Sequence, residues 1–279
     1  MSTREQTIAD ATQIFEHAEY PSGLNKATAW LGIYQTLLWY EPVNLGEFKD
    51  LPHIIEADKL RPSVSAAKKS DWTKPRAWQR RALAFGTYLA EQLNCPADKV
   101  SSKTDLLMKQ ADYAGMQRQN SLGIAFPGLV KHILEKFGTA ALSYQTEVEA
   151  TKIFPGIEVP GRSSTPSIDL LATDGNIPHV VISAKWSLRH DRVNDITNEC
   201  PVYKAAYQRI YRQTRHAKLL YYVVTNEFDP SRLNKVLADT CVDGIIHVHK
   251  AAITGVCRLN GRLTRLIDLA DFISTTSSW

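Results

Sequence analysis

The chain has 279 residues, 44% of them hydrophobic, which is enough to bury a sizeable core in one or two domains. Its formal net charge of +4 permits a nucleic-acid partner but is too small to indicate one. No apolar run approaches the length of a membrane span, and the start Met-Ser-Thr-Arg-Glu-Gln is not a secretory signal, so we expect a cytoplasmic protein.

The first hundred residues predict a helical region. Apolar and aromatic residues recur at helical spacing over 7–19, 24–40 and 75–93, with proline and glycine between these stretches. We therefore expect an N-terminal helical domain, residues 1–104, that serves DNA contact, oligomerisation or both.

The rest of the chain, residues 105–279, predicts a second domain of mixed structure. Helices are expected near 121–137, 189–201, 201–215 and 230–238, and strands at 219–225 and 244–249, in addition to a hairpin over 166–185. Strands that alternate with helices indicate an α/β fold in which helices pack on a mixed sheet.

The four cysteines are scattered and form no Cys-x-x-Cys pair. They are Cys95, Cys200, Cys241 and Cys257. This spacing indicates neither a zinc site nor a disulfide framework, so we expect reduced thiols. His247 and His249 lie two apart on an apolar stretch, but with no third ligand in view we expect surface or hydrogen-bonded histidines.

The hairpin brings together residues that carry chemistry. Asp174-Gly175-Asn176 has the composition of a tight turn between two apolar, β-branched runs. Asp169 and Lys185 lie at nearly equal distances from this turn; if directly opposed, their Cβ atoms would be about 5 Å apart. Ser183 shares a face with Lys185 because strand side chains alternate. One face should then present an acid, a hydroxyl and a lysine.

These groups suit phosphodiester hydrolysis. A carboxylate can hold Mg²⁺ against a phosphate oxygen while an ammonium orients the attacking water or helps to deprotonate it. The second acid that usually stands two residues before such a lysine is replaced here by Ser183. The nearest downstream acids are Asp191, Asp195 and Glu199, and a helix that starts near residue 189 would let Glu199 return to the metal.

The cluster Arg189-His190-Asp191-Arg192 suits the reading of G·C pairs. A guanidinium can donate two hydrogen bonds to guanine, and a carboxylate can accept one from cytosine. At the start of a helix these residues would project into a major groove. Such a cluster is also common on solvated, salt-bridged helix faces.

The residues between Asp169 and Glu199 resemble a known family, the restriction endonucleases that cut CCGG-containing sites. This family has the PD-(D/E)xK nuclease fold, and the resemblance is closest to its BsaWI-like group. The match covers the order acid, Ser-x-Lys, Arg-x-Asp-Arg, Glu over residues 169–199, with Arg189 and Glu199 four and fourteen residues beyond Lys185. The fold implied is α/β, a PD-(D/E)xK restriction-endonuclease-like core of mixed β-sheet flanked by helices, with an N-terminal helical domain.

The resemblance implies a role for each matching residue. Asp169, Glu199 and the backbone carbonyl of Ala184 would bind Mg²⁺, Lys185 would serve the nucleophilic water, and Ser183 would stand in the place of the second acid. For recognition, Arg189, Asp191 and Arg192 would read the CCGG core. Separately, Gln117 and Gln119, in a polar run before the helix at 121, are candidate readers of bases outside that core, although polar linkers have the same composition.

The activity implied is that of a type II restriction endonuclease, part of a prokaryotic restriction-modification system. It would cut both strands of DNA at a short palindrome containing CCGG, with flanking A·T pairs (WCCGGW) and a 5′ overhang of about four bases expected. A palindrome implies a homodimer or a larger homo-oligomer, because each strand needs one active site.

The sequence departs from the family pattern in two places. Ile168 precedes Asp169 where the family often has proline. The upstream helix that usually carries a further glutamate offers one only at its end, Glu135, with Glu147 and Glu149 as alternatives for this accessory acid.

Three other functions stay open at this stage. The first is a related nuclease that reads CCNGG or another target. The second is a sequence-specific DNA-binding protein with a decayed nuclease core, and the third is a helical interaction protein without DNA affinity.

Overall fold

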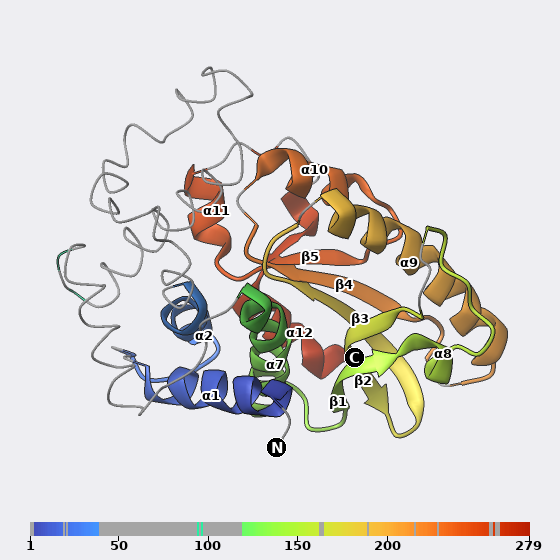
Figure 1. The fold of residues 1–279 in the computed structure, drawn as a ribbon, viewed down its shortest axis with the longest axis horizontal. Coiled ribbons are helices and arrows are strands. Elements are labelled where there is room, and N and C mark those ends of the chain that lie inside the picture. Colours follow the sequence, from blue (N-terminus) through green and yellow to red (C-terminus); the bar gives the residue numbers. More distant parts are fainter. Residues whose placement is uncertain are drawn as a thin grey trace. The chain divides into compact units, whose positions relative to one another are not determined.

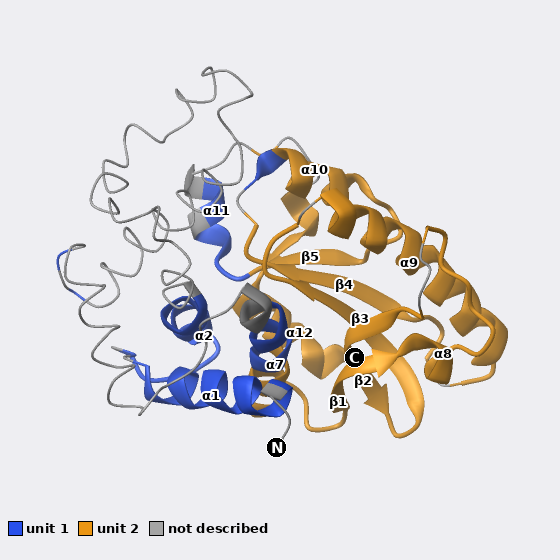
Figure 2. Cartoon of the chain, in the orientation of Figure 1, with its two compact units in different colours: residues 1–129, 228–230, 248–258 blue, residues 130–227, 231–247, 259–279 orange. Residues whose placement is uncertain are grey.

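The computed structural model describes residues 3–18, 20, 22–38, 94, 96, 119–161, 165–188, 190–214, 216–227, 229–256, 259 and 263–279. The chain forms two compact units (Figure 2). Unit 1 comprises Met1–Leu129, Phe228–Pro230 and Val248–Arg258, and unit 2 comprises Val130–Glu227, Ser231–His247 and Leu259–Trp279. The predicted boundary at 104 and the predicted helix at 75–93 lie outside the described residues.

Unit 1 is helical where it is described. Its helices are α1 (Thr3–His17), α2 (Ala29–Ile33), the π-helix η1 (Tyr34–Leu38), α11 (Lys250–Val256) and the first half of α7 (Gln119–Phe137). Close packing explains Gly32 on α2, because a Cβ there would collide with the Phe15 ring and the Tyr20 hydroxyl. The helices predicted over 7–19 and 24–40 are confirmed in part: α1 starts earlier, and turns occupy residues 22–28.

Unit 2 is built on a six-stranded sheet with the strands in chain order (Figure 1). The strands are β1 (Ser143–Glu149), β2 (Ser167–Asp174), β3 (Ile177–Lys185), β4 (Leu220–Thr225), β5 (Gly244–His247) and β6 (Leu266–Asp268). The first three pair antiparallel, and β3 to β6 pair parallel. The predicted α/β class with a mixed sheet is confirmed.

Helices cover both faces of this sheet. They are α8 (Ala150–Ile153), α9 (His190–Ile210), α10 (Pro230–Ala238), α12 (Leu269–Thr275) and the 3-10 turns η8 (Leu263–Arg265) and η9 (Thr276–Ser278). On β4, Tyr221 contacts Tyr203 of α9, whereas the next residue, Tyr222, contacts Phe272 of α12. Since neighbouring strand residues point to opposite faces, α9 and α12 lie on opposite sides of the sheet. Burial on both faces accounts for the continuous apolar runs of β3 and β4.

The predicted hairpin is confirmed, with its turn at Gly175, but its register differs from direct opposition of Asp169 and Lys185. Leu170 pairs with Ile182, and the pairing shifts by one residue at a bulge between Ala172 and Thr173. If the pairing of Leu170 with Ile182 is continued by one residue, Asp169 lies opposite Ser183. The extra residue of the bulge shifts β3 relative to β2 and so produces this register. Lys185 is therefore the diagonal neighbour on the same face.

The expectation of reduced thiols is wrong for one pair, because Cys200 and Cys241 form a disulfide with Cα atoms 6.1 Å apart. Cys200 lies on α9 and Cys241 in the turn before β5, and the fold brings them together across 41 residues of sequence. The separate helices predicted before and after Pro201 are one continuous helix, α9. Cys95 and Cys257 lie outside the described residues.

His247 is fully buried, and its Nε2 lies 3.1 Å from the backbone oxygen of Glu227. His249, in unit 1, stacks on Trp30 with ring centroids 3.8 Å apart, and burial lowers its pKa to about 4. Both histidines are packed against other residues. The alternative of two surface histidines is therefore wrong. In the part of the chain that the structure describes, no helix is sufficiently long and apolar to span a membrane.

Candidate active site

Asp169 on β2 is the centre of a compact polar cluster with three consecutive residues of β3. Its Oδ2 accepts hydrogen bonds from the Ser183 hydroxyl at 3.3 Å and from the Ala184 amide at 2.9 Å. The Lys185 Nζ lies 2.6 Å from Oδ2 and 2.7 Å from Oδ1. The structure thus brings together the acid, the serine and the lysine that the sequence placed on one face.

This cluster is only partly shielded from water. The side chains of Asp169 and Lys185 are 13% and 17% exposed, whereas Ser183 is 4% exposed. An ion pair at this depth is screened less than a surface pair, yet its outer atoms can still meet a substrate or an ion. The open side of the cluster is therefore formed by the carboxylate and the ammonium.

Glu199 approaches the same region from α9. Its side chain is buried, and the Tyr221 hydroxyl donates to its Oε2 at 3.4 Å. Burial raises the pKa of Tyr221 well above 10, and the charges of Glu199, Tyr203 and Asp169 raise it further, while a hydrogen bond with Ser183 acts in the opposite direction. Glu199 is therefore in direct contact with a buried phenol on β4.

Glu147 occupies an unusual position on β1. Thr146 pairs with Leu170 and Val148 with Ile168, so the residue between them stands across from Asp169. Its backbone has φ 56°, a left-handed conformation that costs a side-chain-bearing residue on the order of 1 kcal/mol. The Glu147 carboxylate accepts a hydrogen bond from Ser167 at 3.1 Å. Of the three alternatives for the accessory acid, this one faces the strand position of Asp169.

The other two alternatives take part in local pairs. Glu135 on α7 pairs with Lys131 at 3.3 Å, and its side chain is 46% exposed. Glu149 accepts from Thr151 at 2.8 Å and pairs with Lys152 at 3.1 Å. The Thr151 hydrogen bond, followed by the interactions with Lys152, lowers the pKa of Glu149.

Two of the residues predicted to read bases, Asp191 and Arg192, lie in the first turn of α9. Asp191 is exposed there, where a negative charge interacts favourably with the helix dipole. The Arg192 side chain is 40% exposed and lies 3.5 Å from the Asp195 carboxylate. Arg189 and Gln117 lie outside the described residues, and Gln119 is described only as the first residue of α7.

A buried acid that sequence reasoning missed holds the connection between β3 and α9. Glu227 follows β4, is fully buried, and accepts a hydrogen bond from the Leu188 amide at 2.7 Å. Arg232 pairs with the same carboxylate at 3.5 Å, and the Asn226 amide donates to the Trp186 carbonyl at 3.2 Å. The sequence signal that could have found Glu227 is its place two residues after the strand predicted at 219–225.

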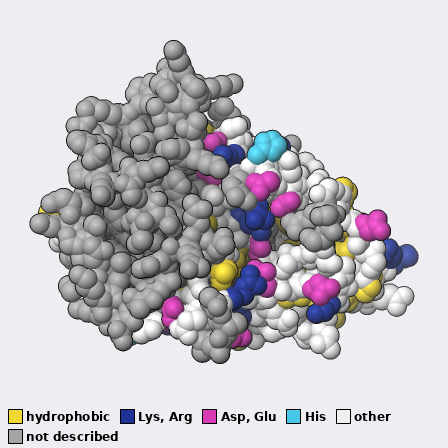
Figure 3. All heavy atoms as spheres, viewed as in Figure 1, with side chains coloured by type: hydrophobic (Ala, Val, Ile, Leu, Met, Phe, Trp, Pro, Cys, Tyr) yellow, Lys and Arg dark blue, Asp and Glu magenta, His cyan; other side chains and the backbone are white. Residues whose placement is uncertain are grey.

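Charge on the face seen in Figure 3 is mixed. There, Lys and Arg side chains of the described residues are interspersed with Asp and Glu side chains. A large basic patch would have favoured nucleic acid independently of the site. The charge on this face therefore does not by itself indicate a nucleic-acid partner.

Among the described residues, no group of three or more His, Cys, Asp and Glu side chains could hold a metal ion. Asp169 is the carboxylate of the cluster, and Glu199 contacts Tyr221 on the neighbouring strand β4. Mg²⁺ is usually bound through one or two carboxylates, together with waters and substrate phosphates. This donor set fits Mg²⁺ and does not resemble a closed structural metal site.

No family model and no curated protein matches the chain. Among solved structures, the chain is similar to metal-depleted Ecl18kI in complex with uncleaved DNA, with 10% sequence identity and a TM-score of 0.35. The alignment covers 99% of this chain and 84% of that one. At this TM-score the likeness carries no argument about the function of the chain.

Proposed function

We propose that the chain is a Mg²⁺-dependent endonuclease with a PD-(D/E)xK core, acting as a type II restriction endonuclease. The observation that carries this proposal is the pairing of Lys185 with Asp169 across the β2–β3 hairpin; Glu199 of α9 contacts Tyr221 on the adjacent strand β4. Phosphodiester hydrolysis uses these groups: carboxylates for a hard cation and an ammonium beside the attacking water.

Each residue has a distinct task in this proposal. Asp169 and Glu199 would hold Mg²⁺, with the Ala184 carbonyl as a further ligand. The bound ion supplies polarisation of the phosphate and a more acidic water. Lys185 would orient that water, since its ammonium already contacts the carboxylate assigned to the ion. Ser183 holds Asp169 in place through the 3.3 Å hydrogen bond.

We assign the accessory acid to Glu147 in preference to Glu135. Glu147 faces the strand position of Asp169, whereas Glu135 is paired with Lys131. The left-handed backbone of Glu147 supports this choice, because strained conformations concentrate at functional sites.

For specificity, we propose that Arg189, Asp191 and Arg192 read a CCGG-containing palindrome, with Gln117 and Gln119 as candidates for flanking bases. Arg and Asp side chains at a helix start match the hydrogen-bonding edges of guanine and cytosine in the major groove. A palindromic target would be read by a homodimer or a larger homo-oligomer.

The test is incubation of purified protein with unmethylated phage DNA and Mg²⁺, followed by sequencing of the fragment ends. We expect discrete ends at CCGG sites with four-base 5′ overhangs, and no cleavage in EDTA or by Asp169→Asn. Ends at CCNGG or another sequence would keep the nuclease and change its target. Specific binding without cleavage in Mg²⁺ or Mn²⁺ would favour the decayed core, and the absence of DNA affinity would overturn the proposal.

A further inference from the structure

We infer that Tyr221 is a positioning residue of the candidate active site: its buried hydroxyl donates to the Glu199 carboxylate and holds it in place for a divalent cation. This inference rests on the proposed function. It adds a residue from a fourth element, β4, to a site assigned to β2, β3 and α9.

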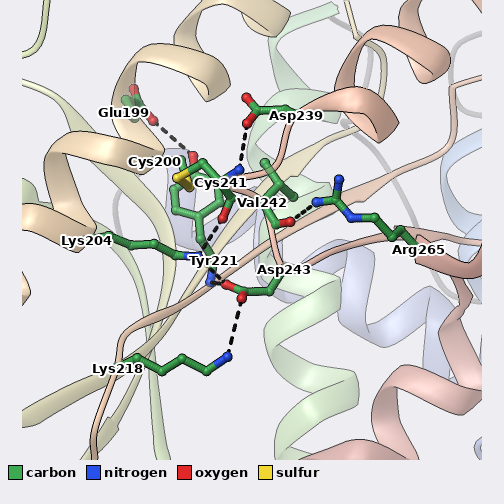
Figure 4. Close-up of a disulfide and its surroundings, with 10 residues drawn as sticks. All are labelled: Glu199, Cys200, Lys204, Lys218, Tyr221, Asp239, Cys241, Val242, Asp243 and Arg265. Carbon is green, nitrogen blue, oxygen red and sulfur yellow. Dashed lines mark hydrogen bonds and ion pairs between the residues drawn. A yellow bond between two sulfur atoms is a disulfide. The ribbon is translucent and has the colours of Figure 1, made fainter. Parts of the chain in front are cut away.

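The sheet register places Tyr221 on the site face. Tyr221 pairs with Val181 and Val223 with Ser183 in the parallel β3–β4 ladder. Side chains two apart share a face, so Tyr221 points to the same side as Ser183, which lies opposite Asp169. Tyr221 is fully buried, and its ring lies under α9 beside Glu199 and Cys200 (Figure 4).

Each of the two acids is held by a different hydroxyl. Ser183 donates to Asp169 Oδ2 at 3.3 Å. The Tyr221 hydroxyl donates to Glu199 Oε2 at 3.4 Å. Since a hydroxyl has one proton to donate, Tyr221 acts on Glu199 and Ser183 acts on Asp169.

Tyr221 acts as a neutral donor to Glu199. A tyrosine with an ordinary pKa of about 10 is protonated at neutral pH, and burial raises the pKa of Tyr221 further. A protonated phenol has one proton to donate, and Tyr221 donates it to Glu199 Oε2. The phenol therefore holds the Glu199 carboxylate in one orientation.

A rigid frame sets the distance between this phenol and Glu199. The Tyr221 amide donates to Asp243 Oδ2 at 2.8 Å, and the Asp243 amide donates to the Tyr221 carbonyl at 2.8 Å. Lys204 of α9 bonds to Asp243 at 2.7 Å, and the disulfide joins Cys200 to Cys241. The strand that carries Tyr221 and the helix that carries Glu199 are thus tied to the same segment, 241–243 (Figure 4).

The test compares Tyr221→Phe with Tyr222→Phe by Mn²⁺ binding, measured by electron paramagnetic resonance without DNA. Tyr222 is the next residue of β4 but lies on the opposite face, against Phe272 and Trp279. We expect Tyr221→Phe to weaken Mn²⁺ binding about tenfold, at the low end for a hydrogen bond to a charged group because the contact is long. Tyr222→Phe should bind Mn²⁺ as the unmodified protein does.

Cleavage supplies a second readout. Tyr221→Phe should need more Mg²⁺ for half-maximal cleavage, approach the unmodified rate at saturating Mg²⁺, and keep its DNA affinity. If Tyr221→Phe does not fold, Tyr221→Met is the second variant: its flexible apolar side chain can fill the buried space but lacks the hydroxyl, so it should weaken Mn²⁺ binding in the same way.

The outcomes separate this inference from the proposed function. If Glu199→Gln abolishes Mn²⁺ binding and Tyr221→Phe binds normally, the positioning role is overturned and the nuclease stands. Equal losses in Tyr221→Phe and Tyr222→Phe would also overturn the role, since they would point to general destabilisation. An unmodified protein that binds no Mn²⁺ and cuts no DNA would overturn both.

Discussion

Lys185 pairs with Asp169 at 2.6 Å although the hairpin register places Ser183, and not Lys185, opposite the aspartate. The long lysine side chain spans the diagonal, and the shorter serine takes the directly facing position. This arrangement places a hydroxyl and an ammonium on one carboxylate, which a direct Asp–Lys pair would not have allowed.

Lys185→Ala should abolish cleavage and retain specific binding. Removal of the ammonium takes away the group next to the attacking water, a loss of about 10²- to 10⁴-fold for general acid–base assistance. Single-turnover cleavage and a gel-shift titration would measure the two properties. Lys152→Ala, at a lysine whose side chain is 74% exposed, is the matched control. Full cleavage by Lys185→Ala would refute the catalytic role.

Arg192→Ala should lower discrimination between CCGG and singly substituted sites by about 1–3 kcal/mol, because it removes hydrogen bonds to guanine. The measurement is competition binding with one-base variants of the site at constant salt. Arg212→Ala, at an exposed arginine beyond the end of α9, removes the same charge and should leave discrimination intact. Unchanged selectivity in Arg192→Ala would remove Arg192 as a reader.

Reduction of the Cys200–Cys241 disulfide should lower the free energy of unfolding by about 4 kcal/mol on the chain-entropy model, since the bond closes a loop with a sequence separation of 41 residues. Urea unfolding with and without dithiothreitol would measure this change. Cys200→Ser should show the lower stability in both conditions. Free-thiol titration of the denatured protein should find fewer than four thiols, and a count of four would contradict the bond.

Unit 2 should lose stability in mild acid through His179. Burial, followed by the nearby His216, lowers the pKa of His179 from 6.5 to about 4. Below pH 6.5 the unfolded chain therefore binds a proton at His179, whereas the folded chain binds it only near pH 4. The free energy of unfolding is therefore highest above pH 6.5 and decreases as the pH falls towards 4. Denaturation midpoints between pH 4 and 7 would show this decline.

The matched variant for this prediction is His179→Phe, which keeps an aromatic ring stacked on His216 but cannot be protonated. The ring centroids of His179 and His216 lie 3.7 Å apart, and His216 Nε2 forms a hydrogen bond with Asp174 Oδ2 at 2.8 Å. His179→Phe should flatten the pH dependence, whereas an unchanged slope would assign the decline to other groups.

Strong local patterns made several elements predictable. The Pro230–Ala238 helix has the predicted bounds, the strand at β4 and the helix at α7 differ by one or two residues, and the hairpin turn is where Asp174-Gly175-Asn176 placed it. In each case the residues of one short segment carry the signal, as a helical or strand period or as turn chemistry.

Other elements were missed because their sequences carry weak signals. The strand Ser143–Glu149 lies at the sheet edge and buries few of its side chains, so it shows little apolar alternation. Pro201 suggested a helix boundary, but α9 continues through it. Tertiary packing of buried residues such as Ile196 and Tyr203 on this helix outweighs the local cost of the proline.

The sequence by itself determined the α/β alternation, the hairpin and the shared face of Ser183 and Lys185, because these follow from the spacing of residues within short segments. Only the tertiary structure decided that Asp169 faces Ser183, that Tyr221 contacts Glu199, and that Cys200 pairs with Cys241. These relationships depend on a bulge, on strand order and on the packing of α9 against the sheet. They join residues far apart in the chain, whose approach no local pattern encodes.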